Sequence, residues 1–232
     1  MTQLTGKLRA EYVKKMFTAI AGRYDRLNRL MTAGQDVRWR RAVIRQARLG
    51  PGERLLDLGA GTGDLAREAL RQQPRAYVIA ADFTPAMMRA GSRHGALPWC
   101  QADALALPYR TGSFAAVVSG FLFRNVIDLD QALGEACRVL SRGGRLVILD
   151  TTRPRRSLFS PMVRLHMHTI IPLLGRVLGG SNAAYRYLPE STEQFLSAEE
   201  LASRMEGAGF SQVSFRVLMF GTVAIHYAEK PA

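Results

Sequence analysis

The chain has few cysteines and no long uninterrupted hydrophobic run. Its 232 residues include two cysteines, Cys100 and Cys137, which cannot form a disulfide framework and whose spacing matches no zinc or redox motif. The longest apolar stretch, 170–178, is interrupted by a proline, a glycine and an arginine and is too short to span a bilayer. The N-terminus lacks the apolar core of a secretion signal. These absences exclude a disulfide-stapled secreted domain and a membrane-spanning protein, so we expect a soluble protein of the cytoplasm.

Acidic residues are scarce in two segments, and the net charge of +13 is therefore unevenly distributed. Residues 1–50 hold twelve basic and three acidic residues, and residues 151–189 hold six arginines and no acid. The rest of the chain is nearly neutral. A solvated face that reflects coding bias would explain this pattern, because arginine outnumbers lysine 28 to 4. The alternative is that both segments meet an anionic surface.

An ordinary globular composition accompanies an alternation of short apolar runs and helical stretches. With 47% hydrophobic and 22% charged residues, the chain belongs to neither the disordered nor the collagen-like class. Strands are expected at 54–58, 77–81, 98–102, 114–119 and 146–149, and helices at 64–73, at 85–93 and from the capping residue Asp128 to Gly143-Gly144. This alternation predicts an α/β fold with a mostly parallel sheet and helices on both of its faces.

The segments on either side of this alternation follow other patterns. A helix is expected from Leu8 to Ile20, then a loop around 24–34 and a basic helix over 36–48. Residues 153–189 show no clear strand, which indicates an inserted lid, and a helix and a hairpin follow the capping box of Ser197 and Glu200. We expect an N-terminal helical cap (1–50), a Rossmann-like core (51–152), a lid insert after strand five (153–190) and a C-terminal part that completes the sheet (191–232).

A glycine-rich turn directly follows the first expected strand, because residues 57–63 read Asp-Leu-Gly-Ala-Gly-Thr-Gly. Glycines permit a tight turn and a close approach of ligand to backbone. A dinucleotide fingerprint requires a further glycine where this chain has Asp64. The pattern instead resembles motif I of the S-adenosylmethionine-dependent methyltransferases, and an acid here suits a ligand with a cationic amino group. The resemblance assigns cofactor binding to Asp57, Gly59, Ala60, Gly61, Thr62 and Gly63.

Acidic residues also close the next two expected strands. Asp82 ends the second strand, where a carboxylate can accept hydrogen bonds from both ribose hydroxyls, and Phe83 follows it. Asp103-Ala104 follows the third strand and resembles the adenine-contacting position of the same fold. A single acid at a strand end is usually solvated. Because ligands of open parallel sheets bind at the carboxyl ends of the strands, three such acids in register predict one site.

Five further segments, in order along the chain, resemble signatures of the ubiquinone/menaquinone biosynthesis C-methyltransferases. They are Tyr24-Asp25-Arg26-Leu27-Asn28 with Trp39-Arg40, Arg124-Asn125-Val126, Arg138-Val139-Leu140 through Gly143-Gly144-Arg145-Leu146, Tyr185-Arg186-Tyr187-Leu188-Pro189-Glu190-Ser191, and Gly221 to His226. The resemblance covers nearly the whole chain. It implies a seven-stranded class I methyltransferase fold. It also implies C-methylation of a polyprenylated quinol by S-adenosylmethionine in menaquinone or ubiquinone biosynthesis, with demethylmenaquinol as the expected substrate.

Three positions near the expected site depart from the family pattern. Asp36 stands where the family has histidine, Gly120 stands where it has serine, and residues 149–152 read Leu-Asp-Thr-Thr in place of Leu-Glu-Phe-Ser. The resemblance assigns further residues to the site: Ser119 and Gly120 to the cofactor, and Tyr24, Asn28, Arg124 and Tyr187 to the quinol.

The resemblance also assigns catalytic roles to Arg124, Tyr24 and Asn125. Methylation of a ring carbon requires the neighbouring hydroxyl to lose its proton, which leaves negative charge on the oxygen. An arginine is a poor proton acceptor, so we expect Arg124 to hold that charge while Tyr24 and Asn125 position a water that carries the proton. Asp36 is an alternative base. The alternative role for Arg124 is a structural ion pair.

Partners follow from the substrate class and the charge. Polyprenylated quinols reside in the bilayer, so we expect the basic segments to associate peripherally with an anionic membrane surface. No metal site is expected, because His166 and His168 lack an acid or cysteine in the insert. The charge suggests a nucleic-acid methyltransferase as one alternative, but no RNA-binding module is visible and we expect no nucleic-acid partner. A noncatalytic scaffold that binds S-adenosylmethionine or a quinone is the other alternative, and a homodimer is left open.

Overall fold

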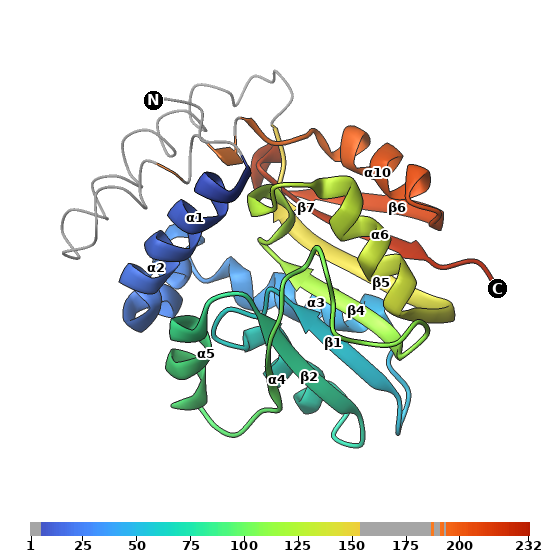
Figure 1. Ribbon diagram of the computed structural model, residues 1–232, viewed down its shortest axis with the longest axis horizontal. Helices are drawn as coiled ribbons and strands as arrows, with labels where there is room; N and C mark the ends of the chain where they lie inside the picture. Colours follow the sequence, from blue (N-terminus) through green and yellow to red (C-terminus); the bar gives the residue numbers. More distant parts are fainter. Residues whose placement is uncertain (1–5, 154–186, 188–190, 193) are drawn as a thin grey trace.

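The fold is built on one twisted sheet flanked by helices (Figure 1). A computed structural model describes residues 6–153, 187, 191–192 and 194–232. The sheet has the strand order β3-β2-β1-β4-β5-β7-β6. Its strands are β1 (Arg54–Leu58), β2 (Tyr77–Asp82), β3 (Trp99–Gln101), β4 (Phe114–Gly120), β5 (Leu140–Thr151), β6 (Ser211–Leu218) and β7 (Val223–Glu229). The expected seven-stranded, mostly parallel sheet is confirmed.

Strand direction places the carboxyl ends of β1 to β5 at one edge of the sheet. These five strands pair in parallel, whereas β7 runs antiparallel to both β5 and β6. The last two strands form the terminal hairpin that the sequence predicts. Asp57 and Asp82 lie at the carboxyl ends of adjacent strands, and Asp103 follows the end of β3. The topology therefore brings the three acids to one edge.

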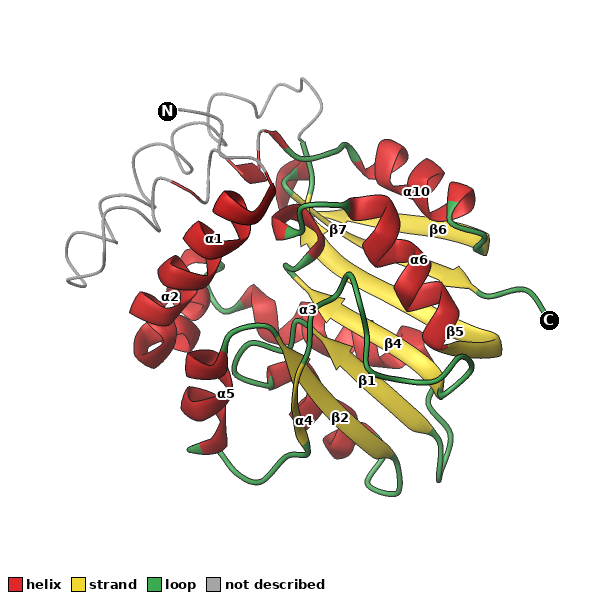
Figure 2. Ribbon diagram, in the orientation of Figure 1, coloured by secondary structure: helices red, strands yellow, loops and turns green. Residues whose placement is uncertain are grey.

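Helices pack on both faces of the sheet, as Figure 2 shows. The elements are α3 (Gln35–Ala47), α4 (Asp64–Gln72), α5 (Pro85–Ser92), α6 (Leu129–Val139) and α10 (Ala198–Gly207). One apolar cluster joins α3 and α4 to the sheet, with Val43, Ile44 and Ala66 at its centre. A second cluster joins α6 and α10 to the opposite face through Leu133 and Leu201. No helix in the described ranges is long and apolar enough to cross a membrane.

Two helices precede the core and cap the carboxyl edge of the sheet (Figure 1). The first, α1 (Gly6–Ile20), matches the expected amphipathic helix, and a short 3-10 turn, η1 (Ala21–Arg23), follows it. The loop expected around 24–34 is wrong, because Tyr24–Met31 form α2. Leu27 and Met31, spaced by one helical turn, bury their side chains against α1, and this packing stabilises a helix that is too short to be stable alone.

The boundary between α6 and β5 also differs from the expectation. The helix ends at Val139 and not at Gly143-Gly144, and β5 begins at once with Leu140. Gly143 has a φ of +71°, and the pairing of β4 with β5 shifts register between Phe114 and Ala116. The glycine pair therefore provides an irregularity inside a long strand instead of a helix stop. Asp128 caps α6 as expected, with its carboxylate accepting from the Gln131 amide at 3.0 Å.

Candidate active site

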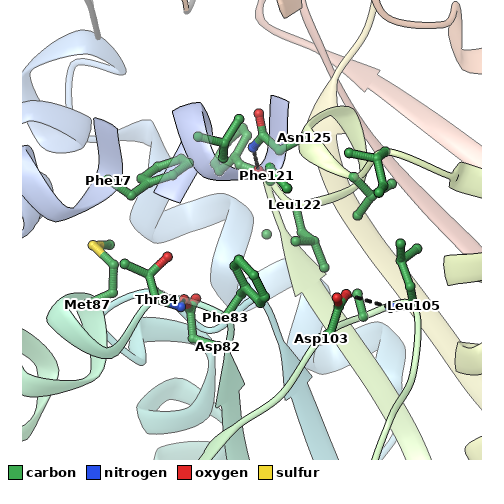
Figure 3. Close-up of a pocket in the computed structure, with 18 of the residues that line it drawn as sticks. Phe17, Asp82, Phe83, Thr84, Met87, Asp103, Leu105, Phe121, Leu122 and Asn125 are labelled. Carbon is green, nitrogen blue, oxygen red and sulfur yellow. Dashed lines mark hydrogen bonds between the residues drawn. The ribbon is translucent and has the colours of Figure 1, made fainter. Parts of the chain in front are cut away.

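A pocket opens at the carboxyl ends of β1, β2 and β4, below α1 (Figure 3). We call it the main pocket. It encloses a cavity of about 120 Å³ that opens to solvent. From α1 it is lined by Ala10, Val13 and Phe17, and apolar side chains make up most of its wall. A smaller, adjoining side pocket lies between the glycine turn and α3.

The glycine turn forms the floor shared by both pockets. Gly59 and Gly61 line both, and each has a positive φ. A Cβ at position 61 would lie 3.4 Å from Met87 and 3.7 Å from Tyr24, inside the main pocket. Gly63 has a different function. It lines neither pocket, and a Cβ there would come within 2.7 Å of Leu97, so Gly63 serves the packing of α4 against the sheet.

Asp82 is the buried acid of the main pocket. Its two carboxylate oxygens accept from the backbone amides of Gly61 and Thr84, each at 2.7 Å. Burial raises the pKa of Asp82, and these two hydrogen bonds oppose the rise. Beside it, Phe83 is 38% exposed and its ring lies under the Lys14 ammonium at 5.1 Å. The carboxylate thus fixes the glycine turn and faces the pocket at the same time.

The third acid lies on the opposite wall. Asp103 accepts from the Leu105 amide at 2.9 Å and is exposed, while Ala104 and Leu105 supply apolar surface. Figure 3 shows Asp103 across the pocket from Phe17 of α1. Of the three strand-end acids, Asp82 and Asp103 therefore line the main pocket, whereas Asp57 lines the adjoining side pocket.

Asp57 is the buried acid of the side pocket. One of its oxygens accepts from the Ala66 amide at 2.9 Å, and the other, Oδ1, is buried with no hydrogen-bond partner in the described part of the chain. Burial raises the pKa of Asp57 to about 7, and the nearby carboxylates of Asp82 and Asp64 add to the rise. Ala60 and Thr62 line the same pocket. An unsatisfied buried carboxylate oxygen here favours a cationic ligand group.

Arg40 occupies the far wall of the side pocket within an ion-pair network. Its guanidinium lies 2.7 Å from Asp36 and 2.6 Å from Asp64. Asp36 is 1% exposed, also contacts Thr32, and lines neither pocket. The structure thus places Asp36 as the counter-ion of Arg40, away from the position that a base acting on substrate would need.

Tyr24 begins α2 and reaches both pockets. Asn28, one turn further along α2, has its Nδ2 buried without a hydrogen-bond partner among the described residues. Burial raises the pKa of Tyr24, against the opposing influence of Asn28 and Arg124. The next residue, Asp25, accepts from the Thr62 hydroxyl at 2.5 Å, which ties α2 to the glycine turn. Asn28 itself does not line either pocket.

Arg124 forms the buried ion pair that was the alternative to its catalytic role. Its Nη1 lies 2.7 Å from Oδ1 of Asp150, and the two side chains are 6% and 0% exposed. The Arg124 amide also donates to Asp150 at 3.2 Å, and its guanidinium lies 5.1 Å from the Phe121 ring. Arg124 lines neither pocket. Sequence reasoning did not identify Asp150, although it stands in the four-residue segment flagged after the fifth strand.

Asn125 faces the main pocket and connects it to Tyr187. The Asn125 carbonyl oxygen accepts from the Tyr187 hydroxyl at 2.8 Å, and its amide donates to the Phe121 carbonyl at 2.9 Å. Burial raises the pKa of Tyr187, and the charges of Arg9 and Arg124 oppose that rise. The other lid residues assigned from the sequence, with Arg155, Arg156 and the His166/His168 pair, lie outside the described residues.

The end of β4 completes the floor. Gly120 lines both pockets, and a Cβ at this position would lie 3.3 Å from Leu65. Ser119 does not line either pocket, because its hydroxyl is buried and donates to the Leu58 carbonyl at 2.8 Å. Phe121, which sequence reasoning missed, has a φ of +61° and lines both pockets. A non-glycine residue in this conformation is strained, and such strain concentrates at functional sites.

Solved structures share the fold at low sequence identity. Haemonchus contortus phosphoethanolamine N-methyltransferase 2 in complex with S-adenosyl-L-methionine matches 84% of this chain and 53% of its own, with a TM-score of 0.64 and 14% identity. The [4+2]-cyclase SpnF matches 95% of both chains with a TM-score of 0.68 and 16% identity. One is a methyltransferase and the other a cyclase, so the likeness shows the fold alone.

Sequence relatives are much closer. The ubiquinone/menaquinone biosynthesis C-methyltransferase UbiE of Desulfotalea psychrophila is 45% identical over 221 residues, which cover 94% of this chain and 90% of the relative. The demethylmenaquinone methyltransferase of Thermus thermophilus is also 45% identical over 221 residues, covering 93% and 100%. The sequence model of the ubiE/COQ5 methyltransferase family matches residues 5–230. The chain therefore belongs to the ubiE/COQ5 methyltransferase family.

Proposed function

We propose that this protein uses S-adenosylmethionine to methylate a ring carbon of a polyprenylated quinol, with demethylmenaquinol as substrate and menaquinol as product. The methyl group replaces a ring hydrogen, which leaves as a proton. The observation that carries the proposal is the pair of adjoining pockets, with acids at three strand ends, in a chain that belongs to this family throughout its length. Relatives named for the two quinone pathways supply the substrate class.

The residues present fit S-adenosylmethionine. The unpartnered oxygen of Asp57 would hold the cationic amino group in the side pocket. Asp82 would accept from the ribose hydroxyls, and Phe83, Asp103 and Ala104 would enclose the adenine in the main pocket. Gly61 leaves the space that a side chain would fill. When bound, this cofactor supplies an electrophilic methyl group for in-line displacement.

The protein's own part is to orient the quinol and to manage the hydroxyl proton. Tyr24 and Asn125 reach the main pocket with polar groups, and we assign them to the positioning of the water that accepts the proton. Arg124 lies behind Asn125 with its charge matched by Asp150. We therefore assign Arg124 a positioning role, because its contacts with Asp150 and the Phe121 ring hold the turn that carries Asn125.

Cofactor affinity is expected to fall as the pH drops below about 7. The free protein holds the pKa of Asp57 at about 7, and a cationic amino group beside it would lower that pKa in the complex. Binding then requires removal of a proton at lower pH, so affinity is constant just above pH 7 and falls by up to roughly tenfold per pH unit below it. Calorimetry from pH 7.5 to pH 5.5 measures this slope. Asp57→Asn should bind weakly and without the slope, whereas a wild-type affinity independent of pH would remove Asp57 from the site.

Membrane association is a further part of the proposal. Lys7 and Lys15 lie exposed on α1, beside the pocket, and no carboxylate in the described ranges pairs with them. Arg153, at the start of the lid segment, pairs with Glu200 at 2.7 Å and is therefore less available to an anionic membrane surface than the two lysines are.

Lys7→Gln/Lys15→Gln should weaken binding to anionic vesicles by roughly tenfold, because each cation near an anionic leaflet adds to attraction that salt screens. Arg153→Gln is the matched control and should change binding little. Sedimentation with vesicles at two salt concentrations measures both. Equal binding to neutral and anionic vesicles would leave the charge without this role.

The function itself is tested by the quinone that accumulates when cells lack this protein. The proposal predicts a demethylated polyprenyl quinone and the loss of its methylated product. A normal quinone profile would contradict it. Restoration of the profile by a variant that binds cofactor but cannot turn over would identify a noncatalytic scaffold instead.

A further inference from the structure

Arg9 of α1 reaches from the cap to the backbone of the active-site turn. Its Nη2 donates to the Arg124 carbonyl at 2.8 Å, a contact that spans 115 residues of sequence. The side chain is half-buried, and the next residue, Ala10, lines the main pocket with Val13 one turn further on. Arg9 therefore lies next to the segment that presents Asn125 to the pocket.

The charge of Arg9 differs from that of the other arginines at the site. Arg124 has a carboxylate partner in Asp150, and Arg40 has two, in Asp36 and Asp64. No carboxylate among residues 6–153 and 194–232 forms an ion pair with Arg9, which donates to the neutral carbonyl of Arg124. Because a buried pair cancels most of its own field, Arg9 contributes more positive potential at this end of the pocket than the paired Arg124 and Arg40 do, among the residues that the structure describes.

A hydrogen bond between Tyr187 and Asn125 links the surroundings of Arg9 to the main pocket. The Tyr187 hydroxyl donates to the Asn125 carbonyl oxygen at 2.8 Å, and Asn125 lines the main pocket. Burial raises the pKa of Tyr187, and among the groups that oppose this rise the charge of Arg9 has the largest effect. The ammonium of Lys14, also on α1, lies instead over Phe83, at the end that the cofactor would occupy.

We propose that Arg9 is a positioning residue for methyl transfer, whose charge stabilises the negative oxygen of the quinol through Tyr187 and Asn125. Arg9 forms no bond to substrate and moves no proton. It lowers the pKa of the substrate hydroxyl, whose proton passes to water. The inference rests on the proposed function for the identity of the substrate, but the electrostatic claim concerns any acidic ring hydroxyl bound beside Asn125.

A coloured hydroxyquinone provides a test that does not need turnover. The absorbance of 2-hydroxy-1,4-naphthoquinone bound to the protein reports its ionisation, and Arg9→Gln should raise the bound pKa by about one unit compared with wild type. Arg9→Lys should restore most of the wild-type value, and Arg26→Gln, at an exposed position of α2 that lines neither pocket, should leave it unchanged. Single-turnover methylation of quinol should slow about tenfold in Arg9→Gln at neutral pH and recover as the pH rises, with cofactor affinity within twofold of wild type.

Equal bound pKa values in Arg9→Gln and wild type would overturn the proposal. Equal losses in Arg9→Gln and Arg9→Lys, with a lower Tm in both, would also overturn it, because they identify a purely structural contact. Absence of quinol methylation by the wild type would contradict the proposed function. The bound pKa of the hydroxyquinone would then alone decide whether Arg9 has the proposed electrostatic role.

Discussion

Arg124→Ala is expected to destabilise the protein by about 3–5 kcal/mol and to reduce turnover about a hundredfold or more. The stability loss follows from Asp150, which is 1% exposed and would keep a buried charge without its counter-ion. The turnover loss follows from the position of Arg124 directly before Asn125 in the turn that lines the main pocket. Urea unfolding and single-turnover methyl transfer measure the two effects.

A double variant separates the two effects. In Arg124→Met/Asp150→Leu both charges are replaced by apolar side chains of similar size, so stability should return to within about 1–2 kcal/mol of wild type. Turnover should remain low, because the hydrogen bonds through which Asp150 holds the turn at Arg124 are gone. A double variant with both wild-type stability and near-normal turnover would show that the pair is only structural. An Arg124→Ala variant of normal stability would contradict the ion pair.

Asp82→Ala is expected to weaken S-adenosylmethionine binding by about 1.5–3 kcal/mol, or roughly 10–150-fold. The carboxylate would lose its contact with the ribose, and the amides of Gly61 and Thr84 that it accepts from would lose their partner. Calorimetry with purified protein measures the change, and kcat at saturating cofactor should fall less than the affinity.

A matched control for this variant is Asp128→Ala. Asp128 also accepts from a backbone amide, at the start of α6, but it does not line either pocket. Its loss should cost about 1 kcal/mol of stability and leave cofactor affinity unchanged. If Asp82→Ala binds the cofactor as tightly as Asp128→Ala does, Asp82 has no role with the ribose.

Much of the core could be predicted because its signals are local. The strands at 54–58 and 77–82 are short buried runs with an acid at or one residue before their carboxyl end, and the glycine turn after the first fixes where the pocket opens. The capping box of Ser197 and Glu200 forms with both hydrogen bonds present. Such patterns depend on a few neighbouring residues, and their geometry follows from backbone chemistry alone.

The remaining features depend on contacts between segments far apart in sequence. The helix at Tyr24–Met31 is stabilised by packing on α1, and Asp150 pairs with a residue 26 positions earlier. Ser119 has the right position in the chain, yet strand alternation turns its hydroxyl toward Leu58 and away from the pocket. Arg9 is 115 residues from its partner, and an amphipathic pattern predicts only that its helix exists.

The most direct test of the proposed activity is single-turnover methyl transfer with purified protein, S-adenosylmethionine and a demethylmenaquinol extract reduced to the quinol. Mass spectrometry of the lipid should show one added methyl group with a ring hydrogen lost, at a rate that Arg124→Ala reduces about a hundredfold. Tight cofactor binding without methylation of demethylmenaquinol or any other polyprenyl quinol would contradict the assignment of this pair of pockets to quinol methylation.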